Sequence, residues 1–180
     1  MPKTGNRPLQ LKQNRSIQQR IIPSPMQIIW RESADIATYE DARVGRVFNH
    51  RRPERFPLAV VKATCQEDIV AAVKLAAEKG CRVAVRSGGH SWAAWSVRDN
   101  SILIDLGNYK TMEVDAVNKV VRASPSITGR ELNSVLVKQH QLMFPGGHCP
   151  SVGLGGFLLQ GGMGWNCRVR TSSSMSVDDG

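Results

Sequence analysis

Short apolar stretches alternate with longer mixed stretches along most of the chain. The short stretches are rich in Val, Ile, Leu and Ala and are bounded by turn-forming residues, which is typical of β-strands. Helix-forming segments separate several of them, so the pattern predicts a mixed fold, either α+β or α/β. The predicted strands are residues 56–63, 81–87, 101–106 and 119–124.

The most clearly marked helix is predicted over residues 64–80. Thr64 and Glu67 have the spacing of a capping box, in which two side chains satisfy free N–H groups of the first turn. Gly80 can adopt the left-handed conformation that ends many helices. Apolar residues at helical spacing predict one buried stripe, which consists of Ile69, Val70, Val73, Ala76 and Ala77.

A second helix is predicted over residues 126–141, with Ser126 or Thr128 as its N-cap. By contrast, residues 1–38 have weak periodicity, so we expect a flexible N-terminal segment and an ordered domain that begins near Tyr39. The inner stripe of the second helix is predicted to consist of Ile127, Leu132, Val135 and Leu136.

The composition is that of an ordinary globular chain, with 180 residues, 41% hydrophobic and 22% charged. No apolar run is long enough for a membrane span, so no membrane partner is expected. Pro23 and Pro25 interrupt the apolar stretch near the N-terminus. No secretory signal is therefore indicated, and a cytoplasmic location is favoured. A mitochondrial presequence stays open, because no acidic residue precedes Glu32.

The net charge of +9 raises the question of nucleic-acid binding. Much of the positive charge lies in the N-terminal segment and in residues 46–55, and no known reading module is present. We therefore expect no nucleic-acid partner. No metal site is expected either, because the cysteines match no zinc spacing. These cysteines are Cys65, Cys81, Cys149 and Cys167.

Two glycine-rich motifs carry candidate chemistry, "VRSGGHSW" at residues 85–92 and "FPGGHCPSVGLGG" at residues 144–156. Backbone N–H groups in such turns can approach a ligand closely and form an anion-binding concavity. Two turns of this kind suit a ligand with two phosphates, so we expect a nucleotide cofactor. The second motif is not a Rossmann fingerprint, because position 158 is Leu and no buried strand precedes it.

Each motif contains one candidate nucleophile, His90 in the first and Cys149 in the second. His148 lies beside Cys149, but further metal ligands at a suitable spacing are lacking. A Cys–His hydrolase would need a base and an orienting group that only the three-dimensional structure can bring together. The residues alone leave open whether His90 and Cys149 are turn residues or cofactor attachment points.

Together with "SILIDL", the two motifs resemble the PCMH-type FAD-binding domain of the vanillyl-alcohol oxidase superfamily, and within it the berberine bridge enzyme-like oxidoreductases. The resemblance covers residues 39–168. It implies an α+β fold, with a small mixed-sheet subdomain and the start of a second α/β subdomain. Members of this family are much longer. The chain is thus expected to be their N-terminal part, with a divergent tail at 169–180 and without the substrate domain.

The resemblance also implies roles for individual residues. His90 corresponds to the histidine that bonds the flavin 8α-methyl carbon, and Cys149 to the cysteine that bonds C6, so FAD is expected to be held by two covalent bonds. Neutral imidazole and thiolate are able to attack these electron-poor positions. His148 is expected to be a loop residue. The residues expected to line the pyrophosphate are Arg86, Ser87, Gly88, Gly89, Ser91, Gly153, Gly155 and Gly156.

The implied activity is hydride transfer from a small organic substrate to flavin N5, followed by reoxidation by O2. Val152 occupies a position near the flavin at which valine accompanies oxidase behaviour in relatives. The family's catalytic base lies in a part that this chain does not match, so no base, substrate or oligomeric state is assigned. The alternative is a truncated flavin-binding protein without turnover.

Overall fold

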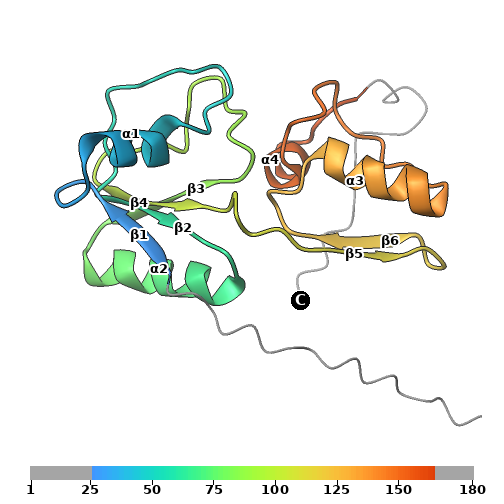
Figure 1. Cartoon of the computed structure of the whole chain (residues 1–180), viewed down its shortest axis with the longest axis horizontal. Helices are drawn as coiled ribbons and strands as arrows, with labels where there is room; N and C mark the ends of the chain where they lie inside the picture. The colour runs from blue at the N-terminus through green and yellow to red at the C-terminus, as the bar shows by residue number, and fades with distance from the viewer. Residues whose placement is uncertain (1–25, 165–180) are drawn as a thin grey trace, which may run out of the picture.

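The computed structural model describes residues 26–164, which form two lobes (Figure 1). The first lobe contains a four-stranded sheet in the order β1–β2–β4–β3, and the second contains the β5–β6 hairpin, which confirms the predicted α+β fold. No helix in this range is long and apolar enough to cross a membrane. In chain order the elements are β1 (Gln27–Trp30), α1 (Ile36–Val44), β2 (Ala59–Lys62), α2 (Gln66–Glu78), β3 (Arg82–Arg86), β4 (Ser101–Asp105), β5 (Met112–Asp115), β6 (Val120–Ala123), α3 (Gly129–Val135), the π-helical η1 (Leu136–His140) and α4 (Leu154–Leu159).

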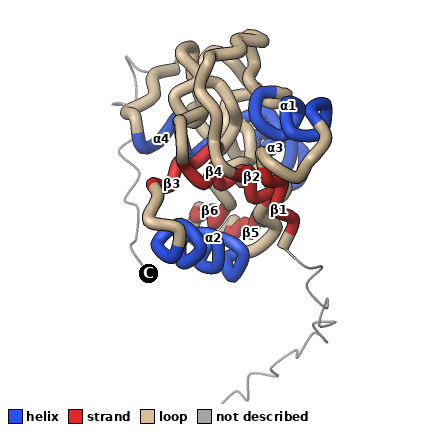
Figure 2. Tube along the Cα trace, turned by 90° about the vertical axis from the view of Figure 1, so that its left-hand side faces the viewer, coloured by secondary structure: helices blue, strands red, loops and turns tan. Residues whose placement is uncertain are grey.

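The sheet of the first lobe lies between α1 on one face and α2 on the other (Figures 1 and 2). Side chains alternate between the two faces along each strand. Leu103 therefore packs in the cluster that contains Tyr39 of α1, whereas Ile102 and Ile104 pack in the cluster that contains Ala72 of α2. All residues of β4 are buried. A strand that is buried on both faces has a nearly continuous apolar sequence, which is why this strand could be predicted.

Strand β1 lies in a segment that we expected to be flexible. It pairs antiparallel with β2, whereas β2 and β3 both run parallel to β4. The expectation of a flexible segment up to residue 38 is therefore wrong for residues 26–38; residues 1–25 lie outside the described part of the chain. Ile29 is buried against the face of the sheet that α1 covers.

Helix α2 begins one residue later than the predicted capping box requires. Cys65 occupies the N-cap position and makes no side-chain capping bond. The Asp68 carboxylate instead accepts hydrogen bonds from the backbone N–H and the hydroxyl of Thr64, both at 2.8 Å. The predicted pairing of Thr64 with Glu67 is thus wrong. Gly80 has a φ of +62°, as expected for the end of a helix.

The buried face of α2 also differs in part from the prediction. Ala72 and Ala76 are buried, and Ile69 packs against them at the edge of the core. Val70 and Val73 are each 47% exposed, although both belonged to the predicted stripe. The spacing of apolar residues could not show which of them face the sheet. The small Ala side chains fit the close contact with the sheet, while Val is tolerated at the surface.

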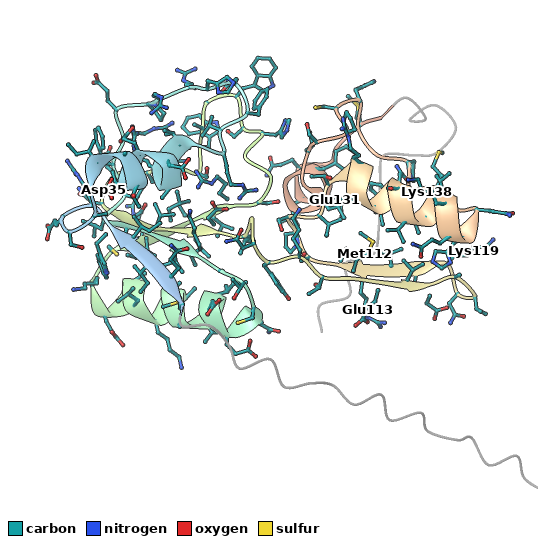
Figure 3. The ribbon with its side chains drawn as sticks, viewed as in Figure 1. Asp35, Met112, Glu113, Lys119, Glu131 and Lys138 are labelled. Carbon is teal, nitrogen blue, oxygen red and sulfur yellow. The ribbon has the colours of Figure 1, made fainter. Side chains whose placement is uncertain are left out.

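In the second lobe, α3 lies across one face of the β5–β6 hairpin (Figure 1). Figure 3 shows Met112 on the side of the hairpin that faces α3 and Glu113 on the opposite side. Thr128 is the N-cap of α3 and forms a complete capping box with Glu131, so one of the two predicted caps is confirmed. The cluster that packs against the hairpin contains three of the four residues of the predicted stripe, Ile127, Leu132 and Leu136, but not Val135.

Two elements of the second lobe were not predicted, β5 and α4. Helix α4 has six residues and begins within the second glycine motif, where glycine lowers helix propensity. The predicted helix over residues 126–141 is also shorter than expected as an α-helix. It continues as η1 and ends at Gln141, which has a left-handed φ of 54°.

A buried ion cluster lies at the end of β4. The Asp105 carboxylate accepts a hydrogen bond from the Arg86 guanidinium at 2.7 Å and pairs on its other oxygen with Arg46. Arg86 also donates to the backbone oxygens of Ala42 and Arg43, at 2.5 and 2.6 Å. Asp105 and Arg86 are 3% and 1% exposed, so these bonds replace hydration for both charges. The cluster joins β3, β4 and the end of α1.

Replacing Asp105 with Asn leaves the buried Arg86 guanidinium without its counter-charge. Breaking one partner of a buried ion pair costs about 3–5 kcal/mol, against a total stability of about 5–15 kcal/mol for a domain. We expect a large fall in the urea midpoint of unfolding. The matched control is Asp115→Asn, at an exposed turn where the carboxylate bonds Asn118. Equal midpoints for the two variants would contradict the prediction.

Candidate functional site

The two glycine motifs contact each other through their backbones. A Cβ placed on Gly88 would lie 2.5 Å from the nitrogen of Gly153, and one placed on Gly153 would lie 2.7 Å from the hydroxyl oxygen of Ser87. Gly89 has a φ of +76°, and a Cβ there would collide with the carbonyl oxygen of Arg46. Gly88 and Gly153 are therefore needed for the close approach of the two loops, and Gly89 for the contact of the first loop with Arg46.

A cavity of about 610 Å³ opens beside these loops. Its volume lies within the range of ordinary ligand sites. The structure brings together around it all the predicted cofactor-binding residues except Cys149. The predicted residues that line the cavity are Arg86, Ser87, Gly88, Gly89, His90, Ser91, Val152, Gly153, Gly155 and Gly156.

Cys149 is joined to His90 through a residue that the sequence analysis missed. The Ser151 hydroxyl oxygen lies 3.3 Å from the sulfur of Cys149 and 3.1 Å from Nε2 of His90. The two predicted nucleophiles therefore share one hydrogen-bonding partner, although they lie on different motifs. The signal that could have identified Ser151 is a hydroxyl two residues after the cysteine, but this pattern is common in loops.

The imidazole of His90 is held by an aromatic stack. Its ring lies 4.5 Å from that of Phe48, at an interplanar angle of 11°, and Phe48 in turn contacts Trp92 edge-on. Burial lowers the pKa of His90 below its usual value of 6.5, because the charged form loses hydration. The ring is therefore neutral at neutral pH, and a neutral imidazole retains a nucleophilic nitrogen.

The thiol of Cys149 is exposed at the surface. Its pKa is lowered from 9.0, mainly by the hydrogen bond with the Ser151 side chain, then by the Ser151 backbone N–H, with a further contribution from the positive charge of Arg130. All three groups stabilise negative charge on sulfur, and the thiolate is the reactive form of cysteine. The environment therefore increases the fraction of Cys149 that is present as the thiolate.

The loop that carries Ser151 is fixed to the first turn of α3. The backbone N–H of Arg130 donates to the oxygen of Pro150 at 2.8 Å, and that of Gly129 donates to the oxygen of Val152 at 3.3 Å. These N–H groups have no partner within the helix, so the loop satisfies them. The residues on both sides of Ser151 are thus held in place.

The side chain of Arg86 does not fit the predicted role at a pyrophosphate. It is 1% exposed, and its guanidinium is bonded to Asp105 and to the end of α1. Among the buried side-chain nitrogen and oxygen atoms of residues 26–164, Nε of Arg86 is the one without a hydrogen-bond partner. We therefore assign the side chain a structural role.

Aromatic residues are part of the lining of the cavity. Trp95 lines it, and the guanidinium groups of Arg55 and Arg98 lie 5.5 and 4.8 Å from the centre of its ring. Tyr39 is buried in the core of the first lobe, whereas Trp92 is 77% exposed and contacts Phe48 edge-on. In residues 26–164 no group of three or more His, Cys, Asp or Glu side chains could hold a metal ion.

Comparison with known proteins assigns a family to this arrangement. Residues 57–178 match the family described as FAD binding domain, which is more than half of the chain. The chain belongs to this family. The match of the FAD-binding domain continues beyond residue 168, where the resemblance placed its end, and into residues 169–178, which were expected to diverge. Those residues lie outside the described part of the structure.

Curated relatives and solved structures agree with this assignment. The chain is 53% identical to FAD-linked oxidoreductase nodO of Hypoxylon pulicicidum over 141 residues, or 78% of this chain and 31% of that protein. It is 32% identical to the xylooligosaccharide oxidase of Thermothelomyces thermophilus over 73% of this chain and 26% of that protein. The wild-type BBE-like 1 structure from Physcomitrella patens matches with a TM-score of 0.70 and 25% identity, over 80% of this chain and 30% of that one. The chain therefore spans about a third of the length of these relatives.

The FAD-binding domain should be sensitive to substitution at Gly89 and insensitive at Gly156. Alanine at position 89 must adopt a positive φ, which costs an L-residue about 1–2 kcal/mol, and its Cβ would collide with Arg46. A Cβ on Gly156 would meet nothing within 4 Å. We expect thermal unfolding to show a clearly lower midpoint for Gly89→Ala than for Gly156→Ala. A similar midpoint for both would argue against the constraint on the first loop.

Proposed function

We propose that this chain is the FAD-binding part of an FAD-linked oxidase that holds its flavin through covalent bonds to His90 and Cys149. The observation that carries the proposal is the convergence of these two side chains on Ser151 beside the glycine-lined cavity. The electrostatic environment favours a neutral imidazole and a thiolate, which are the forms needed for attack on the flavin ring.

The backbone of the first glycine loop supports the assignment of a phosphate-containing cofactor. Within residues 26–164, the N–H groups of Gly88 and Gly89 donate no hydrogen bond, so both are available to an anion. The Ser87 hydroxyl donates to the Pro125 oxygen at 2.6 Å and is therefore already used within the protein. We infer that Ser87 contributes to the pyrophosphate site through its backbone, together with Ser91 and the glycines of both loops.

When bound, FAD supplies the redox chemistry, because its flavin accepts a hydride from the substrate and is reoxidised by O2. The chain positions the ring: Phe48 fixes the plane of His90, and the bonds of α3 to residues 150 and 152 fix the loop of Cys149. Val152 lines the same cavity, and the valine supports an oxidase because its small side chain leaves room for O2. The name of one relative, a xylooligosaccharide oxidase, also supports a small organic substrate.

Covalent attachment is tested by denaturing the flavin-loaded chain and measuring its intact mass. We expect the wild type to retain the mass of one FAD, and His90→Ala and Cys149→Ala each to retain it through the remaining bond. The double variant should lose it on denaturation. Cys65→Ala is a matched control, because Cys65 lies at the start of α2 and is a free thiol. Complete loss of FAD from the denatured wild type would refute covalent attachment.

The role of Val152 in oxygen access can be tested without knowledge of the substrate. The flavin is reduced with light, mixed with oxygenated buffer, and followed by absorbance. We expect Val152→Ile to slow reoxidation, because the additional methyl group narrows the space beside the ring. The control Val120→Ile changes an exposed residue of β6 and should leave the rate unchanged. Equal reoxidation rates in both variants would exclude Val152 as the residue that controls oxygen access.

A further inference from the structure

The Ser151 hydroxyl lies between the two residues that we propose to attach the flavin, and it has one proton for two partners. We propose that Ser151 is a positioning residue that donates its proton to the Cys149 sulfur and accepts the Nε2–H of His90. In this arrangement a single hydroxyl holds Cys149 as the thiolate and His90 as the Nε2–H tautomer. The inference deepens the proposed function and rests on it for the roles of His90 and Cys149.

The direction of the two hydrogen bonds follows from the groups around the sulfur. In the opposite direction, the thiol would donate to Ser151 and would remain protonated. The Ser151 backbone N–H and the Arg130 side chain both favour negative charge at the sulfur, as their effect on the pKa of Cys149 indicates. A sulfur in surroundings that favour negative charge is a better acceptor than donor at its 3.3 Å contact with the Ser151 hydroxyl. The Ser151 proton therefore points toward the sulfur, and its oxygen lone pairs toward His90.

The tautomer of His90 follows from the number of protons that Ser151 and the imidazole carry. Burial keeps the ring neutral, so it carries one N–H. At 3.1 Å from the Ser151 oxygen, Nε2 is the nitrogen that can donate to it. Nδ1 then has the free lone pair, and no other hydrogen bond of His90 occurs within the described residues. The stack on Phe48 prevents the ring from turning away from this contact.

The chain holds Ser151 in a way suited to this role. Its neighbours Pro150 and Val152 are both bonded to the first turn of α3, so its backbone cannot shift without breaking those bonds. The charge that acts on the sulfur is that of Arg130 from α3. His90 is joined to it through Ser151, and His148 is the neighbouring residue in the sequence. Arg130 and His148 are unchanged in the variants below, so a difference between those variants arises from the hydroxyl.

The experiment measures alkylation of Cys149 by iodoacetamide over a pH series in the 180-residue chain without flavin. The rate is read from the mass of the peptide that contains Cys149. The proteins are the wild type, Ser151→Ala, Ser151→Thr and Ser96→Ala, a control serine that lines the same cavity. The midpoint of the profile is compared, because a lower thiol pKa also reduces the nucleophilicity of the thiolate and partly cancels the effect on the rate.

We expect Ser151→Ala to raise the midpoint by about one pH unit, the effect of removing a hydrogen bond to a charged group. Ser151→Thr should restore the wild-type midpoint because it retains the hydroxyl, and Ser96→Ala should not change it. Coincident profiles for the wild type and Ser151→Ala would overturn the proposal, and so would an equal shift in Ser96→Ala. Near-UV circular dichroism shows whether each variant is folded.

A second measurement requires no substitution at Ser151. Long-range ¹H–¹⁵N NMR of the wild type distinguishes the two neutral tautomers of His90, with the signal assigned from His90→Gln. We expect the Nε2–H tautomer, and an Nδ1–H tautomer would overturn the proposal. Neither readout needs FAD. If the wild type fails to retain FAD but shows the expected midpoint and tautomer, the proposed function fails and the role of Ser151 stands. If the wild type retains FAD but does not show the expected midpoint and tautomer, the proposed role of Ser151 fails and the proposed function stands.

Discussion

The buried carboxylate of Asp105 joins the parts of the first lobe on which the site depends. It pairs with Arg86 from β3 and with Arg46 from the segment that follows α1. Arg46 also donates to the backbone oxygen of Ser87 at 2.8 Å, directly before Gly88. Charges shielded from water can be satisfied in few arrangements, so the cluster fixes the relative positions of three segments. The ion cluster therefore determines where these three segments lie more than it increases the free energy of unfolding.

The position of the candidate site follows from this constraint. The segment that carries Arg46 also carries Phe48, so the same stretch fixes the backbone of the first glycine loop and the plane of the His90 ring. The second lobe contributes Cys149 and Ser151 on a loop that α3 holds through backbone bonds. The proposed attachment of one flavin ring through two side chains requires both to be held in a defined geometry, and each lobe holds one of the two candidate residues.

The errors in the predicted fold have local physical causes. Strand β4 and the Thr128 cap were predictable because a doubly buried strand and a capping box are encoded by neighbouring residues. The predicted cap of α2 was wrong by one residue. Asp68 and Glu67 can both accept hydrogen bonds from Thr64, and the backbone turn decides between them. Strand β1 was missed because its hydrogen bonds come from β2, more than twenty residues away in sequence.

The sequence by itself determined the candidate chemistry of this protein: the two glycine motifs, and within them the candidate nucleophiles His90 and Cys149. The tertiary structure decided which groups act on them. Arg86 looked like a phosphate ligand, but Asp105 lies beside it in the fold and takes up its charge. Ser151 had no distinguishing signal, because its partner His90 lies 61 positions away. The type of a residue is known from the sequence. The hydrogen-bonding partner that determines its protonation state depends on how segments distant in sequence pack together.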